Sequence, residues 1–340
     1  MIHILGIESS CDETAASVVS SDRTVLSSVI FSQIDTHAEF GGVVPEIAAR
    51  SHLEKIDIVI KKAIGDAGIT MEKIDAVAAT AGPGLIGGVI VGLTAAKTLA
   101  LATNKPFIAI NHLEGHALVP RLCHNTPFPY LLLLASGGHS QILIAKNVGD
   151  FQLLGTTIDD AAGEAFDKVA KMMDLGYPGG PAIEKYAKNG DKTKFSLPQP
   201  MKGHDNCNLS FSGLKTAVRF AIEKHGEMSE QDKCDLAAAF QNKVVLSICD
   251  RLQNAIKTYK SLFPEGKNIV IAGGVAANSA IRTAVENLAA EHGLAFSAPS
   301  LSLCTDNAAM IAWAGIERFN NGELSTLSVK PRPRWPLDGV

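Results

Sequence analysis

The chain has 340 residues, more than one hydrophobic core usually supports, so two domains are expected. Its 46% hydrophobic and 19% charged residues are typical of a soluble α/β protein, and the net charge of −4 argues against blanket binding of nucleic acid. The sequence predicts no signal peptide and no membrane contact, and its six cysteines, none in a C-x-x-C pair, predict reduced thiols and a cytoplasmic location.

The first half of the chain begins with strands rather than helices. Apolar runs predict strands at 2–7, 15–20 and 24–32, and a helix follows near 50–66. A buried strand at 74–80, the glycine loop AGPGLIGG and a helix to about residue 102 come next. The apolar run of that helix contains Lys97 and several glycines, which favours burial over a membrane span. The strand PFIAI then leads into a helix with the sequence NHLEGHALV.

The second half repeats this order. A strand at 130–135, the turn SGGHS and the strands QILIAK and FQLLGTT precede a helix at 160–173. After an insertion come a long helix near 232–259, the strand NIVIAGG and a helix that starts in AANSAIR. A β-β-β-α-β-α order that occurs twice predicts a duplicated domain, whereas a doubly wound Rossmann sheet needs helices between its first strands.

This plan resembles the α/β fold of the actin, hexokinase and heat-shock ATPase superfamily, in which two ribonuclease-H-like lobes have a cleft between them. Lobe one is expected at 1–128, with 310–340 returning to it, and lobe two at 129–309, with an insertion near 176–230. In that superfamily the first hairpin turn of each lobe faces the phosphates of a nucleotide, here 8–14 and 136–140. Backbone N–H groups of such Gly- and Ser-rich turns suit an anion, although each turn alone could be a simple hairpin.

His112 and His116 lie four residues apart in a predicted helix and share one face of it. Two imidazoles so placed are a common start of a transition-metal site, although a chance pair is the alternative. In zinc proteases of the H-E-x-x-H type the glutamate directly follows the first histidine. Glu114 is two residues on, about 200° round the helix, so it should point away from the metal side, which disfavours the protease mechanism.

Carboxylates follow two other predicted elements. Glu8, Asp12 and Glu13 come directly after the first strand, where they could hold a metal through water, poise a nucleophile, or form a solvated edge cluster. Asp306 ends a loop before a helix, and it or Thr305 could cap that helix. We select Asp306 as the third metal ligand. Two histidines and one carboxylate, with open positions, suit Fe(II) better than a closed zinc site.

Three glycine segments mark the second lobe: GEAFDK, GYPGGP and AGGVAAN. Residues 177–181 are predicted to form a rigid loop. Asp167 could be an ordinary surface carboxylate and Asn278 a simple helix cap. Together these segments place polar groups and glycines at the ends of elements, where layered α/β folds bind ligands.

Two surfaces are candidates for partners. Residues 184–224 carry eight Lys or Arg against four Asp or Glu, which is either a solvated face or a basic surface for nucleic acid. Its candidate phosphate contacts are Lys185, Lys188, Lys192, Lys194 and Lys202. The apolar helix GLIGGVIVGLTAAKTLALA, with residues 47–60, is either buried in its own lobe or a contact for another protein, and Val91 is the position chosen to test it.

Eight ordered segments carry a resemblance to a known family: GIESSCDET, HLEGHA, ASGGHS, DDAAGEAFDKVAK, YPGGP, SFSGLKTA, AGGVAAN and CTDNAAMIA. Over essentially its whole length the chain resembles the TsaD family in its bacterial form. This family provides the universal tRNA threonylcarbamoyladenosine synthase subunit, formerly named O-sialoglycoprotein endopeptidase. The resemblance implies transfer of a threonylcarbamoyl group from threonylcarbamoyl-adenylate to N6 of adenosine 37 in tRNAs that read codons starting with adenine, with release of AMP.

The resemblance also implies roles for individual residues. His112, His116 and Asp306 match the family's iron ligands, which implies one Fe(2+) per chain. The substrate-contacting positions are matched by Ala135, Ser136, Gly137, Gly138, His139, Asp167, Gly180 and Asn278. Glu184 stands where the family often has Asp, so a ribose contact there is less secure. Leu134 stands where archaeal relatives have a tyrosine, so no phenolate ligand is expected. Asp12 is our candidate for deprotonating the amine.

Partners follow from the same resemblance: tRNA, a TsaB-like paralogue and a TsaE-like P-loop ATPase. Two other classes of function remain as alternatives. An ATPase or kinase of the same fold would equally use the two hairpin turns, but it has no need of the histidine pair. A metalloprotease, as the old family name claimed, lacks a base beside the histidines.

Overall fold

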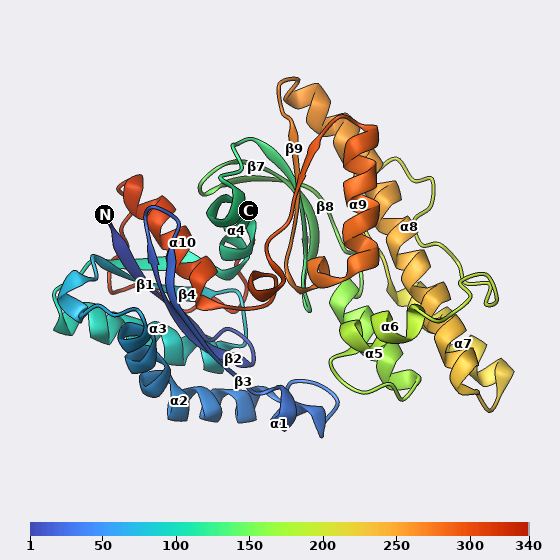
Figure 1. Cartoon of the computed structure of the whole chain (residues 1–340), viewed down its shortest axis with the longest axis horizontal. Coiled ribbons are helices and arrows are strands. Elements are labelled where there is room, and N and C mark those ends of the chain that lie inside the picture. Colours follow the sequence, from blue (N-terminus) through green and yellow to red (C-terminus); the bar gives the residue numbers. More distant parts are fainter. Residues whose placement is uncertain (339–340) are drawn as a thin grey trace. The chain divides into compact units, whose positions relative to one another are not determined.

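The computed structural model describes residues 1–338, and the chain divides into two compact units (Figure 1). Unit 1 consists of residues 1–125 together with the chain from Asp306 onward, and unit 2 of Thr126–Thr305. Within residues 1–338, each unit is built around one five-stranded sheet. No helix of these residues combines the length and the apolar composition that a membrane span needs.

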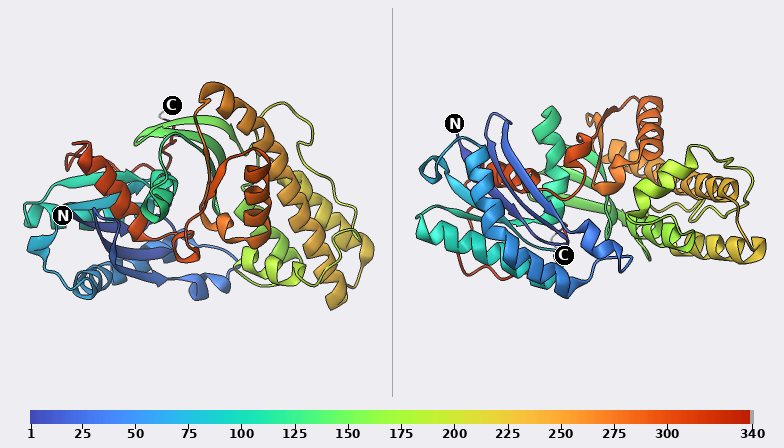
Figure 2. Two further views of the ribbon diagram at one scale, coloured as in Figure 1. Left: turned by 45° about the horizontal axis from the view of Figure 1, so that its top comes forward. Right: turned by 60° about the horizontal axis from the view of Figure 1, so that its bottom comes forward.

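The sheet of unit 1 has the order β3-β2-β1-β4-β5. It contains β1 (His3–Glu8), β2 (Glu13–Ser20), β3 (Val25–Ser32), β4 (Ala76–Gly82) and β5 (Phe107–Asn111). Strands β1 to β3 are antiparallel, and β4 and β5 continue the sheet in parallel with β1. Helices α2 (Pro45–Asp66) and α3 (Ile86–Ala102) pack on one face, and α10 (Ala308–Asn320) packs on the other, next to α4 (His112–His124) (Figure 2). Short helices are α1 (Ile34–Ala38) and η1 (Met71–Lys73).

The two faces of β1 explain how α10 is positioned. Leu5 and Ile7 join the apolar cluster beneath α2 and α3, whereas alternation along the strand turns Gly6 and Glu8 to the opposite face. A Cβ at Gly6 would lie 2.4 Å from the carbonyl oxygen of Ala308 and 2.5 Å from the nitrogen of Ala312. Helix α10 therefore lies directly on β1, and its first turn is fixed beside the end of that strand.

Unit 2 has an equivalent sheet, in the order β8-β7-β6-β9-β10. Its strands are β6 (Tyr130–Ala135), β7 (Ser140–Asn147), β8 (Asp150–Thr156), β9 (Asn268–Ala272) and β10 (Ala295–Ser297). Its helices are α5 (Ala162–Met172), α6 (Gly179–Ala187), α7 (Ser212–His225), α8 (Glu230–Leu262) and α9 (Ser279–Glu291), with η2 (Gly274–Ala277) and η3 (Leu301–Leu303). The same order and directions in both sheets confirm the predicted duplication.

Three local predictions were wrong, and one helix was not predicted. Helices α1 and α2 begin before residue 50, because Pro45 occupies the first turn of α2, where a missing N–H costs nothing. Helix α6 starts at Gly179, inside the predicted 177–181 loop. Helix α7 lies inside the predicted insertion and buries Leu214 and Val218. The cap of α10 is Asn307, whose side chain accepts from the N–H of Met310, so neither Thr305 nor Asp306 caps it.

Candidate metal centre and substrate contacts

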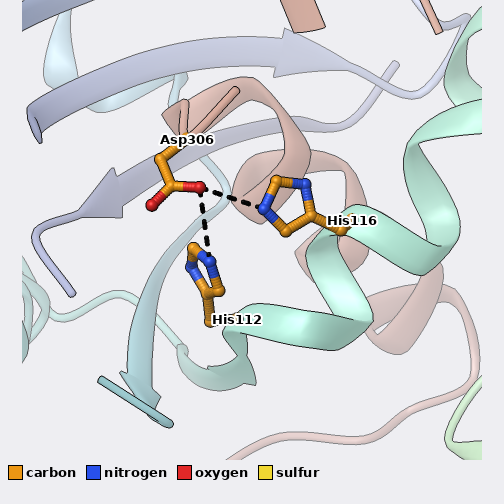
Figure 3. Close-up of side chains that lie close together, drawn as sticks. All are labelled: His112, His116 and Asp306. Carbon is orange, nitrogen blue, oxygen red and sulfur yellow. Dashed lines mark hydrogen bonds and ion pairs between the residues drawn. The ribbon is translucent and has the colours of Figure 1, made fainter. Parts of the chain in front are cut away.

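His112, His116 and Asp306 lie together at one end of unit 1 (Figure 3). Strand β5 ends at Asn111, whose side chain caps α4 by accepting from the N–H of Leu113, so His112 is the first residue of the helix. One oxygen of Asp306 lies 3.0 Å from Nε2 of His116 and 3.4 Å from Nε2 of His112. The three ligand atoms lie within 4.8 Å of one another, a spacing that one metal ion can bridge.

A buried carboxylate lies behind His112. Glu8 ends β1 and its Oε2 is 2.9 Å from Nδ1 of His112, while the Ser10 hydroxyl is 3.1 Å from the same nitrogen. Glu8 also accepts from the hydroxyl of Thr80 and from the N–H of Ser10, both at 2.5 Å. Sequence reasoning named Glu8 but missed Ser10 and Thr80. No local sequence pattern marks them, because Thr80 reaches Glu8 only through the parallel pairing of β1 and β4, which puts Ile7 beside Ala79 and therefore Glu8 beside Thr80.

The charges of this cluster demand a cation. Burial alone would lower the pKa of His112, but the carboxylates of Asp306 and Glu8 raise it well above its ordinary value. Burial alone would raise the pKa of Asp306, but His112 and His116 hold it well below its usual range. A proton on His112 therefore offsets one of the two negative charges, and a bound metal ion could take its place. His116 also suits metal binding. Its Nε2 faces Asp306, and its Nδ1 is buried without a hydrogen-bond partner in residues 1–338.

Asp12 lies on the hairpin turn between β1 and β2, and Glu13 is the first residue of β2. Asp12 is buried, and its backbone carbonyl accepts from the N–H of Gln33. Burial raises the pKa of Glu13 well above its usual range, and the neighbouring carboxylates of Asp306 and Asp12 raise it further. A solvated edge cluster would leave the pKa of Glu13 near its ordinary value, so the burial of this turn argues against that alternative.

Glu114 faces away from the histidine pair, as its spacing predicts. Its buried carboxylate accepts from Nε and Nη2 of Arg318 at 3.0 and 2.7 Å. Arg318 belongs to α10, so this ion pair joins α4 to α10. The glutamate of the H-x-E-x-H pattern is structural, and the geometry offers no protease base at this position.

Hydrogen bonds connect the candidate substrate contacts of unit 2, which lie on successive elements. Residues 135–139 form the turn after β6, closed by a 2.7 Å bond from the N–H of Ser136 to the carbonyl of His139. Gly137 and Gly138 are exposed with open space above them, and the Gly137 carbonyl accepts from the N–H of Glu164 in α5. Asp167, further along α5, accepts from the N–H of Gly179 at 2.7 Å, next to Gly180 in the first turn of α6.

Glu184 and Asn278 continue this connection. The Glu184 carboxylate accepts from both the N–H (3.1 Å) and the hydroxyl of Ser279, at the start of α9. Asn278 caps α9 through the N–H of Ile281 and donates its amide to Gln241. The cap predicted for Asn278 is therefore present. Sequence reasoning missed Ser279 and Gln241, which carry no local signal.

A hollow of about 470 Å³ lies beside Glu184. It is lined by the side chains of two helices and neighbouring loops: Pro181, Glu184, Lys185, Lys188, Ser279 and Arg282, with Ala277 and Leu301. Arg282 is anchored by bonds to the carbonyls of Ala276 and Pro299. Three cations around one carboxylate make this hollow suitable for a ligand that carries phosphate.

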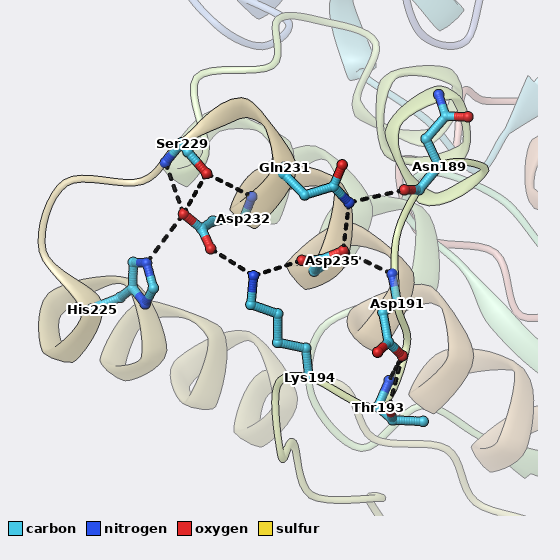
Figure 4. Close-up of polar contacts among 9 residues, drawn as sticks. All are labelled: Asn189, Asp191, Thr193, Lys194, His225, Ser229, Gln231, Asp232 and Asp235. Atoms are coloured by element: carbon cyan, nitrogen blue, oxygen red, sulfur yellow. Dashed lines mark hydrogen bonds and ion pairs between the residues drawn. The ribbon is translucent and has the colours of Figure 1, made fainter.

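One lysine of the basic stretch is already neutralised. Lys194 lies 2.8 Å from a carboxylate oxygen of both Asp232 and Asp235, at the start of α8 (Figure 4). The side chain of Asp235 is only 4% exposed. The other four candidate lysines, Lys185, Lys188, Lys192 and Lys202, are exposed.

Comparisons with known proteins identify the family of the chain. The sequence model of the family described as "TsaD: tRNA N6-adenosine threonylcarbamoyltransferase" matches residues 24–313. A curated relative from Paramagnetospirillum magneticum with the same enzyme name is 58% identical over 336 residues, covering 98% of this chain and 97% of the relative. Another from Brucella suis is 54% identical over 343 residues, covering 99% of this chain and 96% of the relative.

Solved structures with low sequence identity share the fold. HypF from T. kodakarensis superposes with a TM-score of 0.62 at 13% identity, covering 96% of this chain and 49% of that one. Component A of (R)-2-hydroxyglutaryl-CoA dehydratase from Acidaminococcus fermentans gives 0.53 at 15% identity, covering 94% and 99%. These likenesses show a shared fold, and the equal strand order of the two sheets is the one expected of two ribonuclease-H-like lobes. From its sequence matches, the chain belongs to the tRNA N6-adenosine threonylcarbamoyltransferase family, and it is a transferase that modifies tRNA.

Proposed function

We propose that the chain transfers a threonylcarbamoyl group from threonylcarbamoyl-adenylate to N6 of adenosine 37 in tRNAs that read codons starting with adenine. The amine attacks the carbamoyl carbon, the bond from that carbon to the phosphate oxygen breaks, AMP leaves, and the amine loses one proton. The observation that carries the proposal is the joint presence of the His112, His116 and Asp306 cluster and the connected glycine turns of unit 2 in a chain of this family.

The residues of unit 2 suit the adenylate. The exposed Gly137 and Gly138 leave backbone N–H groups open to an anion, and no Cβ obstructs its approach. Asp167, Gly180 and Asn278 belong to the neighbouring elements that these hydrogen bonds connect. Because Glu184 is held by Ser279, its remaining oxygen is the one available to a ribose hydroxyl.

His112, His116 and Asp306 would hold one Fe(2+), which as a Lewis acid would supply charge stabilisation without changing its redox state. Asp12 is the proposed acceptor of the amine proton, because it is a buried carboxylate on the turn that also carries Ser10. The activated donor lowers the demand on the protein, so most of the rate should come from positioning both reactants.

Protein partners form part of the proposal. Exposed apolar side chains on α2 and α3 suit a TsaB-like paralogue, namely Leu53, Ile58, Ile86 and Ile90. A TsaE-like P-loop ATPase would act with this pair. A cytoplasmic location fits six free cysteines and a tRNA substrate.

The test supplies the purified chain, the two partners, ATP, threonylcarbamoyl-adenylate and unmodified tRNA, followed by mass spectrometry of the nucleosides. We expect threonylcarbamoyladenosine and stoichiometric AMP. The matched control is the same tRNA with guanosine at position 37, which should give no product. Phosphorylation of a small molecule or cleavage of a glycoprotein, without modified adenosine, would contradict the proposal.

A further inference from the structure

Both oxygens of the buried Glu8 carboxylate accept hydrogen bonds. Glu8 is 1% exposed, and its two oxygens accept from Ser10 N–H, from the Thr80 hydroxyl and from Nδ1 of His112. All three partners are fixed by main-chain structure: the turn after β1, the end of β4 and the first residue of α4. Glu8 is therefore held in one orientation, with Oε2 directed at the imidazole.

This geometry determines which nitrogen of His112 is free. A neutral imidazole has one N–H and one bare nitrogen, and only the bare nitrogen can bind a metal. Glu8 accepts at Nδ1, so the proton stays there, and Nε2, on the side of Asp306, is left as the ligand atom (Figure 3). A carboxylate behind a ligand histidine also fixes the plane of the ring.

We propose that Glu8 is a positioning residue for the metal centre, which keeps Nδ1 of His112 protonated and Nε2 directed at the ion. This inference rests on the proposed metal centre and adds a residue to it. The two nitrogen ligands are then unequal, because Nδ1 of His116 has no such acceptor within residues 1–338.

Glu8→Gln is the informative change because an amide cannot satisfy all three donors. With its NH₂ toward His112 it donates to Nδ1 and moves the imidazole proton to Nε2, which blocks the ligand atom. With its NH₂ on the other side it faces the N–H of Ser10, which is also a donor. The second orientation sets two buried donors against each other, so the first should prevail and weaken binding of Zn²⁺ or Co²⁺ by about 10- to 100-fold in a chelator competition.

The matched control is Glu114→Gln, which changes a buried carboxylate that lies on α4, the helix that carries His112, and is bonded to Arg318 instead. We expect its metal affinity to equal that of the wild-type chain. Thr80→Val, which removes one donor from Glu8, should give a smaller loss than Glu8→Gln and serves if the latter does not fold.

A spectroscopic readout separates positioning from a purely structural role. In the Zn²⁺-loaded, ¹⁵N-labelled wild-type chain, His112 should show a protonated Nδ1 and a metal-bound Nε2. The Nδ1 proton should be shifted by its bond to Glu8, and that signal should be lost in Glu8→Gln but retained in Glu114→Gln. Wild-type affinity and an unchanged His112 signal in Glu8→Gln would overturn the inference. A wild-type chain that binds neither ion would overturn the metal centre itself.

Discussion

At the scale of single residues, the candidate metal centre of unit 1 combines two histidines with carboxylates whose pKa values are shifted in opposite directions. His112 lowers the pKa of Asp306 and of Glu8 despite their burial, whereas burial and acidic neighbours raise the pKa of Glu13 well above its usual range. Groups whose pKa values are moved in opposite directions within one small volume are typical of a functional site. The chemistry of the cluster therefore depends on whether a proton or a metal ion supplies its positive charge.

Asp306→Ala and Asp12→Asn should separate metal binding from proton transfer. Asp306→Ala removes the oxygen shared by both histidines, so bound iron should fall to background and transfer should be lost, with circular dichroism unchanged. Asp12→Asn should retain the iron and lower the rate of transfer by about 10²- to 10⁴-fold. Elemental analysis and the nucleoside assay measure the two effects. Full metal occupancy in Asp306→Ala would remove that residue from the ligand set.

At the scale of elements, the site depends on how closely α10 lies on β1. Asp306 directly precedes the cap of α10, and the helix can approach only because residue 6 has no side chain. Gly315 of the same helix packs against Ala78 of β4 in the same way. Small residues on both sides thus place a metal ligand that is distant in sequence from the histidines.

Gly6→Ala should damage both stability and metal binding. The added Cβ would meet main-chain atoms of α10, so the free energy of unfolding should fall by about 1–3 kcal/mol and iron should bind more weakly. Gly65→Ala is the control, since its Cβ meets no atom within 4 Å and lies in α2, and it should raise stability by about 0.5–1 kcal/mol. Urea titrations of both variants give the comparison, and equal effects would refute the packing argument.

Helix α3 allows a sharper test of the partner surface than the position chosen from sequence. Val91 packs against the core of unit 1, so a charge there would disturb the fold, whereas Ile90 is 46% exposed. Ile90→Glu should weaken binding to the TsaB-like paralogue by about tenfold or more, because an unpaired charge would be buried. Phe220→Glu, on the exposed face of α7, should leave that affinity unchanged in a titration calorimeter. Equal affinities for both variants would leave α3 without a role in the contact.

The order of elements could be predicted from sequence, whereas their contacts could not. Strand β6 was expected at 130–135 and is found there, because its apolar run is bounded by proline and glycine turns. The histidine pair was visible because both residues lie on one helix. The bond between Glu8 and His112 spans 104 residues and depends on the register of β1, β4 and β5, which no local pattern encodes. Helix α7 was missed because its apolar spacing lies in a polar segment.

At the scale of the whole molecule, the two units share one sheet order but present different chemistry after their first strand. The turn of unit 1 carries carboxylates, and the turn of unit 2 carries exposed glycines. The net charge of −4 likewise conceals local differences, because acidic residues of α8 neutralise part of the basic stretch. A count of lysines in the basic stretch therefore overestimates how many are available to a polyanion.

Lys194→Met should destabilise the chain in a pH-dependent manner. Bonds from Lys194 lower the pKa of Asp232 and Asp235, so their contribution to stability is complete above about pH 4, the pKa of a free aspartate, and is lost as the pH falls from there through the lower pKa values of the folded chain. The urea midpoint of Lys194→Met should lie below that of the wild-type chain at pH 7, by a difference that is smaller at about pH 2. Lys192→Met, an exposed neighbour, should match the wild-type chain at both values. A constant difference across this range would exclude the ion pairs as the cause.

The remaining exposed lysines should contribute to binding of tRNA. Each phosphate contact adds about 0.7–0.9 to the slope of log affinity against log salt. Changing Lys185, Lys188 and Lys192 together to Gln should therefore lower that slope by about 2 to 3 and weaken binding at low salt, irrespective of tRNA sequence. Metal content should not change, because all three residues lie in unit 2 and the metal candidates lie in unit 1. Lys194→Gln is the matched control, because its charge is already paired, and it should leave the slope unaltered. If Lys194→Gln alone flattened the slope while the triple variant did not, the tRNA-contacting surface would have to be reassigned to the region of Lys194 and α8.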